Sequence, residues 1–193
     1  MVEREFKAVI SEKTHETLIA ALDTRAASSK VLHINYYFDT PDFFLHGKDS
    51  TLRVRQGKQS LKMQYKYNKH QVGSIRTSTE FDVLLQRLPL CIMSNELPNG
   101  SDMSGLYFGH VGSLATERLN YVLNGATISV DTNYYLGVCD YEIEIEHEES
   151  ATINRILERL HLDTTSIVCT GKYNRFVIAC KKHQKERSSH ANV

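Results

Sequence analysis

Apolar and polar residues alternate along most of the chain, which is the pattern of half-buried β-strands. Neighbouring segments are joined by turn-forming residues, most clearly Gln56-Gly57-Lys58 and Asn124-Gly125, which favour hairpins. The sequence therefore predicts a largely antiparallel sheet. Its expected strands are the alternating segments 2–10, 30–39, 50–57, 60–67, 75–84, 114–123, 126–135 and 139–147.

Helical spacing of apolar residues occurs in only a few places. Ser11 is positioned to cap a helix that ends near Asp23, and Ser150 is positioned to cap a second helix that runs to about Leu160. A third helix is expected near residues 172–183, where Phe176 and other apolar residues recur. These three segments are the elements available to cover the sheet.

The stretch between the two groups of strands does not divide the chain into two domains. Residues 94–105 are polar and contain Pro98 and two glycines, which predicts a loop, but too few residues lie on each side for two hydrophobic cores. We therefore expect one domain over residues 1–180. The polar segment 181–193 is expected to be a frayed helix end followed by a disordered tail.

One face of nearly every expected strand is charged. In the first strand Glu3, Glu5 and Lys7 share a face, opposite Phe6 and Ala8. A sheet of about eight strands tends to close on itself, with helices covering its apolar face. The sequence thus predicts an α+β fold: a closed eight-stranded antiparallel β-barrel with a charged lumen and helices packed outside. Similar charged faces carry Arg53 and Arg55; Lys62, Gln64 and Lys66; Glu80 and Asp82; Arg118 and Asn120; Ser129 and Asp131; and Glu142, Glu144 and Glu146.

Like charges are grouped within this expected lumen. Buried charges without partners cost several kcal/mol each, so the arrangement requires pairing, hydration or a ligand. A divalent cation would relieve the repulsion among Glu142, Glu144 and Glu146, and a polyphosphate would neutralise Arg53 and Arg55. The expected ligand is therefore a metal-bound polyphosphate.

The amino-acid composition limits the binding partners and the cellular location that we expect. The 193 residues contain 23 Lys and Arg against 23 Asp and Glu, so the formal net charge is zero. A general binder of nucleic acid or of anionic membranes needs a basic excess, and we expect neither partner. No apolar run approaches the ~18 residues that span a bilayer, and no secretory signal begins the chain, so we expect a cytoplasmic protein. Four scattered cysteines, Cys91, Cys139, Cys169 and Cys180, are expected to be reduced, semi-buried thiols.

A series of motifs follows in order along the chain: Glu3-Arg4-Glu5-Phe6-Lys7, Tyr36-Tyr37-Phe38-Asp39-Thr40-Pro41, Leu52-Arg53-Val54-Arg55, Met63-Gln64-Tyr65-Lys66, Thr116-Glu117-Arg118, Asp131, Tyr141-Glu142-Ile143-Glu144 and Lys172. Together they resemble the CYTH domain, or triphosphate tunnel metalloenzyme, superfamily over about residues 2 to 176. Within it the chain is most similar to a small single-domain branch from Gram-positive bacteria, whose members are often labelled adenylate cyclase.

The resemblance implies roles for the matching residues. Mg²⁺ or Mn²⁺ would be held by the carboxylates of Glu3, Glu5, Asp131, Glu142 and Glu144. Phosphates would be held by Lys7, Arg53, Arg55, Lys62 or Lys66, Arg118 and Lys172. The catalytic set would comprise Glu3, Glu5, Lys7, Arg53, Arg55 and Glu144.

Some of these assignments stay open at the level of sequence. The metal-binding pair is either Glu142 with Glu144 or Glu144 with Glu146. The segment around Glu80 and Asp82 cannot be aligned uniquely with the family, and we favour Glu80 over Asp82 as the matching residue. Lys172 lies outside the expected strands. It can reach the lumen only if its helix docks at one mouth, where we expect it to act as a lid ordered by bound polyphosphate.

The residues support metal-dependent triphosphate hydrolysis ahead of two alternatives. Phosphoryl transfer needs positioning and charge neutralisation rather than a Ser, Cys or His nucleophile. The same site could make cyclic AMP from ATP, but no motif indicates an adenine pocket, and Phe43, Phe44, Tyr36 and Tyr37 are expected to pack rather than to stack on a base. A non-catalytic polyphosphate or nucleotide sensor is the third possibility. The sequence does not identify the triphosphate, the preferred metal or the oligomeric state.

Overall fold

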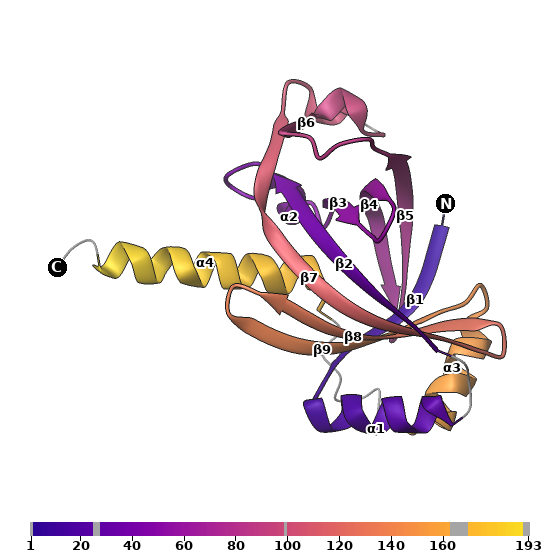
Figure 1. Cartoon of the computed structure of the whole chain (residues 1–193). Helices are drawn as coiled ribbons and strands as arrows, with labels where there is room; N and C mark the ends of the chain where they lie inside the picture. The colour runs from indigo at the N-terminus through magenta and orange to yellow at the C-terminus, as the bar shows by residue number, and fades with distance from the viewer. Residues whose placement is uncertain (1, 25–27, 99, 163–169, 191–193) are drawn as a thin grey trace.

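The computed structural model describes residues 2–24, 28–98, 100–162 and 170–190 (Figure 1). Within these residues the fold consists mainly of nine strands, together with four α-helices and two short 3₁₀ helices. In chain order the elements are β1 (Val2–Ile10), α1 (Glu12–Asp23), β2 (Ser28–Asp39), α2 (Phe44–Gly47), β3 (Thr51–Gln56), β4 (Leu61–Val72), β5 (Ile75–Leu84), β6 (Cys91–Met93), η1 (Ser94–Glu96), η2 (Gly100–Met103), β7 (Tyr107–Leu123), β8 (Ala126–Tyr135), β9 (Val138–Glu146), α3 (Ser150–Arg159) and α4 (Lys172–His190).

Eight of the nine strands close into an antiparallel barrel. The order β2-β3-β4-β5-β1-β9-β8-β7 is completed by pairing of β7 with β2, from Ser28 opposite Tyr121 to Asp39 opposite Gly109. Closure therefore leaves no free edge between the first and last strands of the ring. The predicted eight-stranded antiparallel barrel is confirmed. The ninth strand, β6, pairs with β7 outside the ring.

The expected strands are present, and several extend further than the sequence pattern indicated. β7 begins at Tyr107 rather than near residue 114, and β4 continues to Val72. The β7–β8 hairpin turns at Asn124 and Gly125, with φ of 53° and 81°. Two consecutive residues with positive φ give the twist that a tight hairpin needs, which explains the Asn-Gly sequence.

The apolar faces of the strands point outward, and helices cover them on one side of the barrel. Phe6, Ile128 and Ile143 are fully buried beneath α1 and α3, which supply Leu22 and Ile153 to the same core. Figure 1 shows these two helices below the barrel. Ser11 caps α1 as expected, its Oγ accepting a hydrogen bond from the Thr14 backbone N–H at 3.1 Å. In α3 the N-cap position is Glu149, one residue before the expected Ser150.

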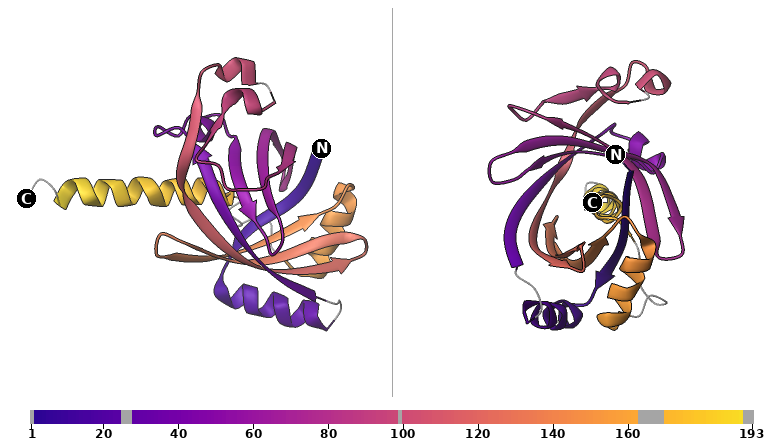
Figure 2. Two further views of the ribbon diagram at one scale, coloured as in Figure 1. Left: turned by 45° about the horizontal axis from the view of Figure 1, so that its top comes forward. Right: turned by 90° about the vertical axis from the view of Figure 1, so that its right-hand side faces the viewer.

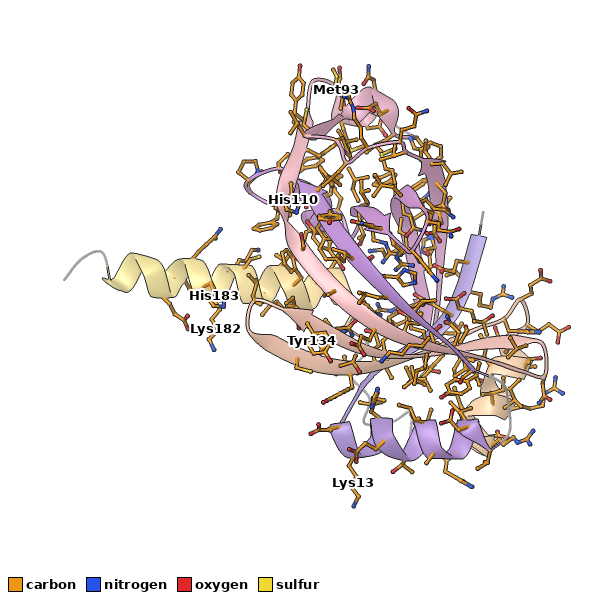
Figure 3. All side chains as sticks on the ribbon, viewed as in Figure 1. Lys13, Met93, His110, Tyr134, Lys182 and His183 are labelled. Carbon is orange, nitrogen blue, oxygen red and sulfur yellow. The ribbon has the colours of Figure 1, made fainter. Side chains whose placement is uncertain are left out.

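The opposite apolar face is covered in a way that the sequence did not predict. Residues 94–105, expected to be a loop, contain η1 and η2, which pack with β6 over β3, β4 and β7. Ile92 and Leu97 from this cap join Leu52 and Val54 in a second core. The cap stands at the top of the molecule, with Met93 at its outer surface (Figure 3).

α4 differs from the other helices because it begins at one mouth of the barrel and extends outward (Figures 1 and 2). Its first turns pack between β2, β7 and β8 through Tyr173, Phe176 and Val177. The helix runs to His190, so residues 181–190 of the expected helix end and tail belong to the helix. The expectation that helices lie outside the barrel holds for α1 and α3, whereas α4 starts inside its rim.

Two further expectations can be compared with the structure. No described helix is both long and apolar enough for a membrane span. Cys91, Cys139 and Cys180 are free thiols, but Cys91 and Cys139 are exposed rather than semi-buried, and Cys169 lies outside the described residues.

Candidate functional site

The charged strand faces line the lumen, as the alternation predicted. They surround a cavity of about 340 Å³ that receives side chains from six strands and from the start of α4. The opposite faces of the same strands are buried in the two apolar cores. Because side chains alternate along a strand, the charged side chains must point into the lumen. Among the residues that line the cavity are Glu5, Lys7, Tyr37, Arg53, Lys66, Glu144 and Lys172.

One side of the lumen, which we call the carboxylate wall, consists of Asp131, Glu142 and Glu144 with the cations Arg118 and Lys172. The three carboxylates lie within 4.8 Å of one another and are almost completely buried. Lys172 Nζ lies 2.8 Å from Asp131 Oδ2 and 2.7 Å from Glu144 Oε1, and it also contacts Glu142. Arg118 donates two hydrogen bonds of 2.7 Å to Asp131 and a third to Glu144. A third cation, Arg175, contacts Glu142 Oε2 at 2.7 Å, so three cations lie against the three carboxylates.

The pKa shifts reflect this balance. Burial alone would raise the pKa of Glu144, but Arg118, Lys172 and Lys7 hold it well below its usual range. Burial also raises the pKa of Glu142, to about 7, and the adjacent Glu144 adds to the shift despite Lys172. The wall thus holds one firmly ionised carboxylate beside one that takes up a proton readily.

A second acidic group lies further along the lumen. Carboxylate oxygens of Glu3, Glu5 and Glu146 come within 4.8 Å of one another. Glu5 accepts a 2.7 Å hydrogen bond from Lys7, and Glu3 is paired with Lys66. Burial raises the pKa of Glu146 to about 7, and repulsion from Glu144, Glu3 and Glu5 adds to it. The three carboxylates of this group are paired with two cations, Lys7 and Lys66, so an excess of negative charge remains.

Both acidic groups fit a divalent metal by their chemistry. Each offers three carboxylate oxygens in one small volume, the ligand type that Mg²⁺ and Mn²⁺ prefer. The raised pKa of Glu146 indicates repulsion that a cation would relieve. The structure places Glu142 and Glu144 together with Asp131, whereas Glu146 lies with Glu3 and Glu5, so the alternative pair of Glu144 and Glu146 is divided between the two groups.

The facing side of the lumen, the arginine wall, consists of Asn35 and Tyr37 on β2, Arg53 and Arg55 on β3, and Gln64 on β4. Arg53 Nε donates to Gln64 Oε1 at 3.0 Å, and Arg55 Nε donates to Asn35 Oδ1 at 3.0 Å. Neither guanidinium forms an ion pair with a carboxylate in the described part of the chain. Burial lowers the pKa of Arg55 to about 9, and Arg53 and Arg118 add to the shift. Amide oxygens therefore orient two positive charges without neutralising them.

The two lysines that shared a strand face have different surroundings. Lys66 lines the cavity and contacts Glu3 and, at 3.5 Å, Glu80. Lys62 forms an exposed ion pair with Asp82 at 3.2 Å, nearer the end of the barrel. Gln64 Nε2 donates to Glu80 Oε1 at 2.8 Å, which ties Glu80 to the arginine wall. The geometry thus favours Lys66 over Lys62 as a ligand for phosphate in the cavity.

Lys69 also lines the cavity, although sequence reasoning did not select it. Simple alternation after Lys66 places Lys69 on the outer face. A β-bulge after Tyr67, where Asn68 has φ of 50°, shifts the register and turns Lys69 inward. Its Nζ donates to Thr51 Oγ1 at 3.0 Å. Asn68, a residue that tolerates positive φ, was the sequence signal that could have indicated the bulge.

The start of α4 is held at the mouth by specific contacts. Tyr173 Oη donates to Asp39 Oδ2 at 2.6 Å, and Asp39 also accepts the backbone N–H groups of Leu45 and His46. Lys172 already has three carboxylate partners, so polyphosphate is not needed to supply its negative charge. The helix docks at the mouth as expected, and its lysine is already paired there without polyphosphate.

Comparisons with known proteins agree with this architecture. Residues 1–173 match the model of the CYTH domain family. The candidate triphosphatase YjbK of Bacillus subtilis (strain 168) is 26% identical over 175 residues, which cover 83% of this chain and 87% of YjbK.

Solved structures show the same fold. A candidate adenylate cyclase from Bacillus halodurans has a TM-score of 0.66 and 26% identity, covering 89% of this chain and 95% of that one. HpAC1 from Hippeastrum, a candidate adenylyl cyclase described as having a dominant triphosphatase activity, has a TM-score of 0.68 and 20% identity, covering 90% of this chain and 94% of that one. At that identity the second likeness concerns the fold.

Proposed function

Because the chain belongs to the CYTH domain family, we propose that it is a divalent-metal-dependent hydrolase of a triphosphate substrate. The observation that carries the proposal is the presence of two acidic groups and an arginine wall in one lumen, whose cavity is lined by Glu5, Glu144 and Arg53 from these groups. Carboxylates suit a metal, and guanidinium groups without carboxylate partners suit phosphate oxygens. The candidate triphosphatase YjbK, similar over most of its length, supports the same activity class.

The acidic residues would hold the metal. We assign Mg²⁺ or Mn²⁺ to Glu3, Glu5, Asp131, Glu142 and Glu144, with Glu146 as a further ligand beside Glu3 and Glu5. When bound by these residues, the metal would supply neutralisation of phosphate charge and a lowered pKa of water for attack on phosphorus. In this proposal Glu3, Glu5 and Glu144 are catalytic through the metal.

The basic residues would hold and orient the phosphates. Arg53 and Arg55 are available without breaking an ion pair, whereas Arg118 and Lys172 must share their carboxylates or exchange them for phosphate. Lys7 and Lys66 lie in the same cavity between the two walls. These cations oppose the charge that shifts during phosphoryl transfer, which is the main catalytic demand of the reaction.

Cyclic AMP formation is the second candidate because relatives carry the name adenylate cyclase. It would require a pocket that clamps a nucleoside. Tyr37 and Phe43 instead pack against the first turns of α4, in a cluster with Tyr173 and Phe176. A polyphosphate or nucleotide sensor is the third candidate, and it would bind without turnover.

A product assay decides among the three. The protein is incubated with inorganic triphosphate, ATP and thiamine triphosphate, each with Mg²⁺ or Mn²⁺, and the products are separated by chromatography. Hydrolysis releases orthophosphate; cyclisation releases diphosphate and cyclic AMP. Arg53→Ala should abolish the reaction, while Lys13→Ala, on the outer surface of α1 (Figure 3), should not. Binding of all three compounds without any product would support the sensor.

We propose a cytoplasmic location on the basis of the free thiols. Cys91 and Cys139 are both exposed and unpaired, a state that a reducing compartment preserves. The proposed partners are the metal and the small triphosphate alone, since the formal net charge of zero provides no general attraction for nucleic acid.

A further inference from the structure

Two buried side chains of the arginine wall have hydrogen-bond donors without acceptors. Asn35 and Tyr37 are both 0% exposed. Within the described part of the chain, Asn35 Nδ2 and Tyr37 Oη have no hydrogen-bond partner. A buried donor left unsatisfied costs about 1–3 kcal/mol, so such groups require an explanation.

The orientation of the Asn35 amide is fixed by its neighbour. Arg55 Nε donates to Asn35 Oδ1 at 3.0 Å, and a guanidinium can only donate, so the oxygen must face Arg55. The Nδ2 group is therefore left as a donor with two protons. In the antiparallel register of β2 and β3, Asn35 lies opposite Arg55 and Tyr37 lies opposite Arg53. All four side chains are therefore on the lumen face of two neighbouring strands.

The Tyr37 hydroxyl lies where negative charge is favoured. Its ring packs on Tyr173 and Phe176, with ring centroids 4.7 and 5.2 Å away, while the residue also lines the cavity with Arg53. Burial raises the pKa of Tyr37, and the nearby cations oppose that shift without reversing it. The phenol therefore keeps its proton at neutral pH and can donate it in a hydrogen bond.

We propose that Asn35 Nδ2 and Tyr37 Oη, together with Arg53 and Arg55, form a binding subsite for one phosphate group of the substrate. The subsite rests on the proposed function, and it gives Asn35 and Tyr37 a phosphate-binding role that the resemblance did not assign to them. Two neutral donors satisfy phosphate oxygens while two cations balance the phosphate charge. None of its four members is a carboxylate, so each of them can offer the phosphate oxygens a hydrogen-bond donor.

The subsite is tested by removing one hydroxyl. Tyr37→Phe keeps the ring that packs on α4 and removes a donor that lacks a partner in the ligand-free protein. Its melting temperature without ligand should equal or exceed that of the wild type. The stabilisation by inorganic triphosphate, measured by thermal unfolding with EDTA and again with Mg²⁺, should fall, with affinity weakened about tenfold.

Tyr135→Phe is the matched control. Tyr135 packs in the same aromatic cluster, with its ring centroid 6.3 Å from Phe176, but its hydroxyl donates to Asp140 at 2.7 Å. This variant should lose stability without ligand and keep the full stabilisation by triphosphate. A second variant, Asn35→Asp, exchanges the donor for a carboxylate that would pair with Arg55, and it should also lose triphosphate binding.

The outcomes separate the subsite from the proposed function. If the wild type gains no stability from triphosphate under either condition, the proposed function fails and the subsite fails with it. If the wild type is stabilised and both Tyr37→Phe and Asn35→Asp are stabilised equally, only the subsite is overturned. A Tyr37→Phe protein that is less stable without ligand would show that the hydroxyl already has a partner, which also overturns the proposal.

Discussion

The carboxylate wall and the arginine wall face the same cavity but manage buried charge in opposite ways. In the carboxylate wall, Lys172 and Arg118 pair directly with Asp131 and Glu144. In the arginine wall, amide oxygens orient Arg53 and Arg55 but leave their charge uncompensated. The paired charges of the carboxylate wall need no ligand, whereas the uncompensated charges of the arginine wall lower the stability of the ligand-free protein. Removing a charge should therefore lower the stability of the folded protein in the carboxylate wall and maintain or raise it in the arginine wall.

The largest effect is expected for Glu144→Gln in the carboxylate wall. Its carboxylate contacts Arg118, Lys172 and, at 3.2 Å, Lys7, so neutralising it leaves buried cations short of a partner. We expect loss of turnover and a free energy of unfolding lowered by about 3 kcal/mol. Denaturant titration and phosphate release measure the two effects. Glu117→Gln, which breaks an exposed pair with Lys30, is the control and should change neither.

Arg55→Met should reduce activity strongly while sparing the fold. We expect turnover to fall about 10²–10³-fold, as for removal of a group that stabilises the transition state. Burial disfavours the Arg55 charge in the folded protein, so the melting temperature should hold or rise. A clear loss of stability would contradict the contrast between the walls, because it would mean that Arg55 is structurally paired.

Glu146→Gln tests the second acidic group through stability against pH. The pKa of Glu146 is raised from 4.5 to about 7, so the folded state binds a proton more tightly than the unfolded state. The wild type should therefore lose stability as pH rises from 4.5 through 7. Glu146→Gln should remove this part of the pH dependence and melt about 4 °C higher at pH 8 in EDTA. Thermal scans between pH 4.5 and 8.5 would refute the prediction if the two curves stayed parallel.

Lys69→Met should have the smallest effect, confined to substrate binding and dependent on pH. Burial lowers the pKa of Lys69 to about 8, so its positive charge is lost as pH rises through that value. KM for inorganic triphosphate should increase a few-fold between about pH 7 and 9 in the wild type and less in Lys69→Met. Equal pH profiles for the two proteins would exclude Lys69 from the site.

The sequence was sufficient to predict the barrel because alternation is a local property. Leu52 and Val54 had to be buried, which placed Arg53 and Arg55 in the lumen before any contact was known. The cap over the second core was missed because Ile92 and Leu97 lie in a short, irregular segment without a period.

Features that depend on contacts distant in sequence could not be predicted. In the sequence, Glu144 stands between Glu142 and Glu146 on one strand face, a grouping that indicated mutual repulsion. The structure surrounds Glu144 with cations from β1, β7 and α4, so the repulsion argument applies to Glu146 instead. Periodicity identifies which side chains share a face, but it does not say which of them pair across the lumen.

The position of Lys172 has a consequence for the order in which the protein is made. A ribosome releases β1 to β9 first, and these strands contain every partner needed to close the ring. Asp131, Glu142 and Glu144 then share a buried wall in which Lys172 is still missing, since that lysine follows 26 residues after the end of β9 at Glu146. The nascent barrel must therefore keep water, a proton or a metal at this wall until α4 emerges. The wall thus acquires its final charge balance only after α4 has joined the barrel.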